Sequence, residues 1–120
     1  MSDLQCPAQV WLVAAGQSAD VPVPCAGVFV TPALATDAGA AALARAASCP
    51  LEVLADAIDA ASTARAIDDL ADLHRGETFV VVVTREVLHD LTGRAPTQSI
   101  IVAIDSEGWR VQTSAEPRKV

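Results

Sequence analysis

Residues 78–83 read Thr-Phe-Val-Val-Val-Val, and this stretch decides the fold class. β-branched and aromatic side chains favour strands, and an unbroken apolar run is typical of a strand covered on both faces, as in the centre of a parallel sheet. A helical apolar period precedes it over residues 58–74, and Gly76 is the expected C-terminal cap residue of that helix. A helix followed by a buried strand indicates an α/β layered sheet.

Other apolar runs extend this architecture in both directions. A helix capped by Thr36 is predicted to reach residue 47 and to place Ala40, Leu43, Ala44 and Ala47 on one face. A short helix is expected at residues 85–91. The predicted strands cover residues 9–13, 27–30, 51–54, 78–83, 99–104 and 109–113.

The expected fold is therefore α/β, a layered, mostly parallel central sheet flanked by helices, with an antiparallel C-terminal hairpin that turns at residues 105–108. No internal repeat or linker interrupts the chain, so residues 1–120 are predicted to form a single domain with a polar tail from about residue 114.

The composition argues against several classes of partner. The net charge is −7, and the eight basic residues are scattered, so neither nucleic acid nor an anionic membrane is an expected partner. The chain has no basic N-terminal region and no apolar run of the ~20 residues that a membrane span needs. These features favour a cytoplasmic protein.

The three cysteines Cys6, Cys25 and Cys49 are an odd number without the spacing of a structural zinc site. We interpret them as reduced thiols that act as small buried side chains, and we expect neither a metal nor a cofactor.

Three segments together resemble the histidine phosphatase (phosphoglycerate mutase-like) superfamily, whose members begin with a strand running into Leu-Val-Arg-His-Gly-(Gln/Glu)-(Ser/Thr). Residues 12–18 read Leu-Val-Ala-Ala-Gly-Gln-Ser. Residues 74–86 resemble a later family segment that consists of His-Pro-Gly-Glu-Thr, a valine-rich strand and Ser-His-Gly-Gly. The chain end, from residue 98 to residue 113, also resembles the family, whose members often close with a strand, an acidic glycine turn and a strand that begins with tryptophan. A typical member is considerably longer, so the chain resembles a shortened relative.

The resemblance implies that the family's catalytic positions are degenerate. Ala14 stands where the arginine is expected, Ala15 where the nucleophilic histidine is expected, and Thr84 where the second histidine is expected. Alanine has neither a nucleophile nor a charge, and a threonine hydroxyl is neutral. Because losing one member of such a catalytic unit removes most of the rate enhancement, we expect no phosphohistidine chemistry and name no catalytic residue.

Residues that could still hold a weakly bound phosphate or other small anion are few. Gly16, Gln17 and Ser18 follow a predicted strand and could offer backbone N–H groups, or they form an ordinary turn. Arg65 is similar in setting to the family's phosphate-holding arginine, although a solvated arginine paired with Asp68 or Asp69 is the simpler interpretation. Arg85 follows the valine strand, either as an anion ligand or as the first residue of an exposed helix.

The histidines offer no obvious replacement for the missing catalytic groups. His74 is expected at the end of a helix, where an imidazolium is favoured, and His89 is expected on an exposed helix surface.

Three hypotheses for function remain. The first is a non-catalytic binding or interaction module, because the framework is kept while both histidines are replaced; a homodimer or a protein partner fits it. The alternative is a residual or altered phosphatase or phosphomutase-type enzyme acting on a small phosphorylated molecule. In the third, the resemblance is architectural only, since a fold does not determine a function.

Overall fold

A computed structural model describes residues 7–15, 25–93, 100–105 and 108–114. A short 3-10 helix at Pro32–Leu34 follows the second strand. The strands are β1 Ala8–Ala14, β2 Val28–Val30, β3 Leu51–Val53, β4 Thr78–Val83, β5 Ile100–Asp105 and β6 Gly108–Ser114. The helices are α1 Ala38–Ala47, α2 Ala60–Leu73 and α3 Arg85–Thr92.

The described strands form one six-stranded sheet in the order β3-β2-β4-β1-β5-β6. β3, β2, β4 and β1 are mutually parallel where they pair, β5 is antiparallel to β1, and β6 is antiparallel to β5. The predicted fold class is confirmed: the sheet is mostly parallel, and its C-terminal strands form an antiparallel hairpin. The valine strand β4 lies inside the sheet between β2 and β1, as its unbroken apolar sequence predicts.

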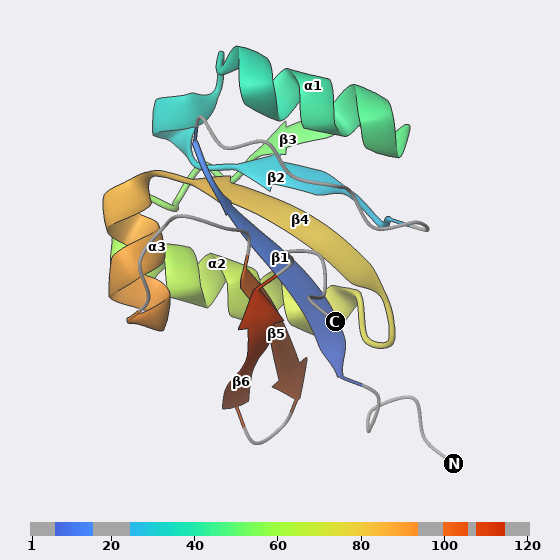
Figure 1. Cartoon of the computed structure of the whole chain (residues 1–120), viewed down its shortest axis with the longest axis vertical. Coiled ribbons are helices and arrows are strands. Elements are labelled where there is room, and N and C mark those ends of the chain that lie inside the picture. Colours follow the sequence, from blue (N-terminus) through green and yellow to red (C-terminus); the bar gives the residue numbers. More distant parts are fainter. Residues whose placement is uncertain (1–6, 16–24, 94–99, 106–107, 115–120) are drawn as a thin grey trace, which may run out of the picture.

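Helices cover both faces of the sheet (Figure 1). On one face, Ala40 and Ala44 of α1 pack against Val80 and Val82. On the other face, α2 and α3 cover Phe79 and Val81, with Ile67 from α2 among the buried side chains. Two apolar layers therefore enclose β4, and the small side chains of α1 allow that helix to approach the sheet closely.

Local capping sets where the helices begin. The predicted cap of α1 is wrong by one residue, because Asp37, not Thr36, accepts a hydrogen bond from the Ala40 N–H at 2.9 Å. Helix α2 begins later than its periodicity suggests, since Asp59 and Ser62 cap each other's backbone N–H groups reciprocally. Capping thus leaves Ile58 outside the helix.

Other local predictions have mixed outcomes. The predicted face of α1 is buried or half-buried at all four positions. The expected cap residue of α2 is wrong: Gly76 has a positive φ of 77°, but His74 is the C-terminal capping residue. The predicted polar tail from about residue 114 lies almost wholly outside the described residues. Within the part that is described, no helix is long and apolar enough to cross a membrane.

Candidate functional site

The positions expected to be degenerate meet at the carboxyl ends of β1 and β4. Ala14 pairs in register with Val83, and the Ala15 N–H donates to the Val83 carbonyl oxygen at 2.8 Å. Ala15 and Thr84 therefore continue two adjacent parallel strands, whose axes lie ~4.8 Å apart. Ligands of α/β proteins bind at this edge of the sheet, so its geometry suits a site, while Ala15 and Thr84 place no imidazole there.

Thr84 uses its hydroxyl for a structural purpose. Its Oγ1 accepts a hydrogen bond from the Val87 N–H at 3.3 Å and caps α3 at the N-terminus. The Thr84 carbonyl oxygen accepts a further bond from the Leu88 N–H at 2.9 Å. A capping threonine satisfies an N–H that the helix itself leaves unpaired, which accounts for this residue without any catalytic role.

A second threonine ends the neighbouring strand at the same edge. Thr31 follows β2 and is buried, and its N–H donates to the Val82 carbonyl oxygen at 3.4 Å. Its hydroxyl has no hydrogen-bond partner among the described residues. An unpaired buried hydroxyl costs about 1–3 kcal/mol, so the fold leaves a polar group unsatisfied at this edge.

Arg85 lies beside this edge but in an acidic setting. It is exposed at the first position of α3 and lines a shallow depression together with Glu86, His89 and Asp90. The carboxylates of Glu86 and Asp90 offset the positive charge of Arg85, so the depression attracts an anion only weakly. The other proposed anion ligands, Gly16, Gln17 and Ser18, lie outside the described residues.

Arg65 lies on the exposed face of α2 and lines a separate depression. Its neighbours there include Asp56, Asp68 and Asp69. No ion pair within 4.0 Å joins Arg65 to an acid in the described chain; Asp68 Oδ1 instead accepts a 2.6 Å hydrogen bond from Trp109 Nε1. A phosphate at Arg65 would face three carboxylates, which opposes its binding.

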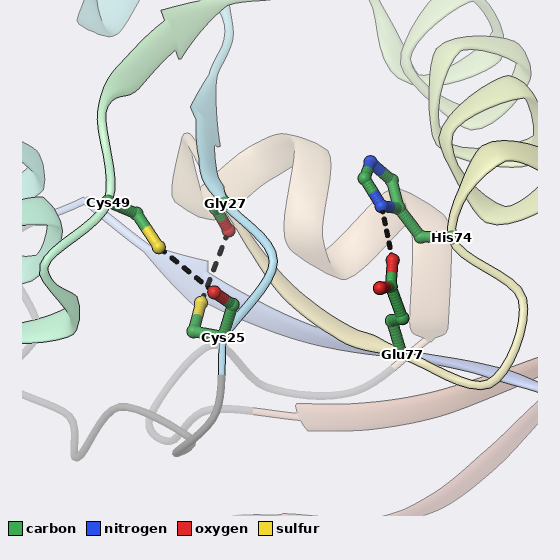
Figure 2. Close-up of polar contacts among 5 residues, drawn as sticks. All are labelled: Cys25, Gly27, Cys49, His74 and Glu77. Atoms are coloured by element: carbon green, nitrogen blue, oxygen red, sulfur yellow. Dashed lines mark hydrogen bonds and ion pairs between the residues drawn. The ribbon is translucent and has the colours of Figure 1, made fainter.

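Neither histidine lies at the edge where Ala15 and Thr84 meet. His74 ends α2 near the amino end of β4, and its Nδ1 lies 2.8 Å from Glu77 Oε1 (Figure 2). The length of β4, about 20 Å for its six residues, separates it from Thr84. His89 is exposed on α3, as expected. No histidine in the described chain occupies the edge formed by Ala15 and Thr84.

Sequence reasoning missed one pair of adjacent thiol side chains, Cys25 and Cys49. Cys49 Sγ donates to the Cys25 carbonyl oxygen at 3.0 Å (Figure 2). Burial raises the pKa of the Cys25 thiol, and the neighbouring Cys49 raises it further. A signal was present, since each cysteine stands two or three residues before a strand of a parallel pair. The described residues contain no cluster of three or more His, Cys, Asp or Glu side chains that could hold a metal ion.

The fold and its carboxyl edge define an α/β protein with a mixed six-stranded sheet. No family model and no curated protein matches the chain.

Proposed function

We propose that this protein is a non-catalytic, histidine-phosphatase-like domain that binds another protein. The proposal that the domain is non-catalytic rests on the adjacency of Ala15 and Thr84 at the ends of β1 and β4. Alanine supplies no nucleophile at one position, and at the other the hydroxyl caps α3. This geometry supports a retained framework whose family chemistry has been lost.

A binding role is supported by apolar side chains next to the edge strand β3. Among the described strands, β3 pairs only with β2, so its outer edge exposes backbone groups that could pair with another chain. Val53 is 46% exposed and Ile58 is 82% exposed. The Ile58 N–H donates to Ser62 Oγ at 2.9 Å, which holds the turn while its side chain faces solvent. A large apolar side chain held in solvent favours an interaction surface.

The charge around this surface indicates the chemistry of the partner. Glu52, Asp56 and Asp59 are exposed near Val53 and Ile58. Hydrogen bonds from the Ser62 backbone and hydroxyl lower the pKa of Asp59, so it is ionised at neutral pH. Two such acidic surfaces would repel each other, whereas an apolar segment with basic residues would be attracted. The proposed partner is therefore an extended, basic and apolar segment of another protein.

The catalytic half of the proposal is tested with p-nitrophenyl phosphate across acidic to alkaline pH. We expect no turnover above buffer, in the wild type and in Thr84→Ala alike. Thr84→Ala is expected to lower the free energy of unfolding by about 0.5–2 kcal/mol through loss of the α3 cap, and Thr84→Ser is expected to retain most of it. Turnover that disappears in Thr84→Ala or Arg65→Ala would show an altered enzyme instead.

The binding half is tested with a short synthetic peptide that alternates valine and lysine, followed by fluorescence anisotropy. We expect saturable binding that Ile58→Asp weakens at least tenfold and that added salt weakens further, because the charges are solvent-exposed. Leu73→Asp is the matched control, since Leu73 is 76% exposed at the far end of α2.

An equal loss of peptide affinity in Ile58→Asp and Leu73→Asp, or no binding by the wild type, would contradict the proposal that the peptide binds beside β3. A concentration-dependent dimer in sedimentation that Ile58→Asp dissociates would replace the basic partner with a second copy of the chain.

A further inference from the structure

Cys25 and Cys49 lie side by side although 24 positions separate them in the sequence. Cys49 Sγ is 3.0 Å from the Cys25 carbonyl oxygen, and Cys25 Sγ is 3.4 Å from the Gly27 carbonyl oxygen. Figure 2 shows the Cys49 side chain pointing toward Cys25. Both residues are half-buried.

The sheet explains this proximity. β2 and β3 are adjacent and parallel, with Val28 opposite Leu51, and the cysteines precede these residues by three and two positions. Neighbouring strands lie ~4.8 Å apart, and a disulfide requires ~4.4–6.8 Å between Cα atoms. By the register of β2 and β3, Cys25 and Cys49 stand one position away from being directly opposite. Since the Cα–C and C=O bonds measure about 1.5 and 1.2 Å, Cys49 Sγ lies within about 6 Å of Cys25 Cα.

A disulfide requires the two cysteine side chains to turn their sulfurs toward each other. The bond from Cys25 Sγ to the Gly27 carbonyl is a weak one at 3.4 Å, so Cys25 can leave it at small cost. Cys49 already directs its sulfur at the Cys25 backbone. We therefore expect changes of rotamer at the two cysteines to accompany disulfide formation.

We propose that Cys25 and Cys49 form a redox modification site, in which hydrogen peroxide oxidises them to an intramolecular disulfide joining the entrances of β2 and β3. The Cys49 thiolate attacks one peroxide oxygen, which breaks the O–O bond and yields a sulfenic acid and, after protonation, water. The Cys25 sulfur then displaces the sulfenic oxygen as a second water. Two thiols and one peroxide thus become one disulfide and two waters.

Burial raises the pKa of the Cys25 thiol, which reduces its thiolate fraction at neutral pH. The Cys49 sulfur is directed at the Cys25 backbone, so a sulfenic acid on Cys49 would form next to Cys25. In this proposal Cys25 is the resolving residue, and dimedone labelling of Cys49 tests that order.

The test is peroxide treatment of the folded full-length chain, alkylation of remaining thiols, and mass mapping of peptides without reduction. We expect a peptide linking Cys25 to Cys49, two hydrogens lighter than the free pair and restored by dithiothreitol. The oxidised protein should melt roughly 5–10 °C higher, since the disulfide closes a loop of 25 residues. In Cys25→Ser, dimedone should label Cys49 as a persistent sulfenic acid.

Cys6→Ser is the matched control and should leave the disulfide unchanged, because Cys6 has no part in the pair. Circular dichroism establishes that each variant is folded, and Cys25→Ala serves as a second variant. A disulfide that includes Cys6, or thiols at Cys25 and Cys49 that peroxide leaves unlinked in the folded wild type, would overturn the proposal.

Discussion

Replacing Phe79 with alanine will lower the free energy of unfolding by about 3–5 kcal/mol, the cost of emptying a large buried aromatic site. Phe79 is fully buried in the interior strand β4. Its ring meets Phe29 edge-on at a centroid distance of 5.8 Å and lies 5.6 Å from the His74 ring. Urea denaturation followed by circular dichroism measures the loss, because a chain of this size is expected to unfold cooperatively.

Leu73→Ala is the control for Phe79→Ala, since Leu73 is exposed and its truncation should change stability by less than about 0.5 kcal/mol. A double-mutant cycle with Phe29→Ala should show a coupling of about 0.5–1.5 kcal/mol from the edge-to-face contact. If Phe79→Ala cost no more than the control, Phe79 would not lie in the core that the structure describes.

The second large effect is expected at Leu88, the buried residue through which α3 holds the sheet. Leu88 is fully buried in the cluster that covers one face of β4, and its N–H is bonded to the Thr84 carbonyl oxygen. Leu88→Ala should lower the free energy of unfolding by about 2–5 kcal/mol. Hydrogen exchange should also show faster exchange of the Leu88 and His89 amides, because α3 loses its main anchor.

Leu91→Ala provides the comparison for Leu88→Ala, because Leu91 is only half-buried against the same cluster. Its truncation should cost less than half as much. Equal costs at both positions would mean that α3 packs through a different face from the one described.

The fold was largely predictable because its signals are local. The valine run at 78–83 has a composition that only a strand buried on both faces accommodates, and β4 indeed lies between two strands and two helix layers. The helical spacing of small apolar residues in α1 likewise predicted its buried face. Helix starts were less predictable, since Asp37 and Thr36 are both good caps and the choice depends on which side chain reaches the Ala40 N–H.

The candidate site was predictable in part. The resemblance singled out Ala14, Ala15 and Thr84, and the parallel pairing of β1 with β4 brings them together. The acidic neighbours of Arg65 and Arg85 depend on how helical surfaces curve and on which turns lie beside them, and sequence spacing alone does not determine this. The Asp68–Trp109 hydrogen bond joins residues 41 positions apart and gave no local signal.

The sequence by itself determined that Ala15 and Thr84 supply neither an imidazole nor a charge, because that property belongs to each side chain wherever it lies. It also determined the layered α/β class, because the spacing of apolar residues indicates which segments are helices and strands and which faces they bury. Only the tertiary structure decided that Ala15 and Thr84 are neighbours, that Ile58 stands in solvent beside β3, and that Cys25 contacts Cys49. These are contacts between distant segments, and strand order creates them: β2 pairs with both β3 and β4, which places residues far apart in sequence a few ångströms apart in space.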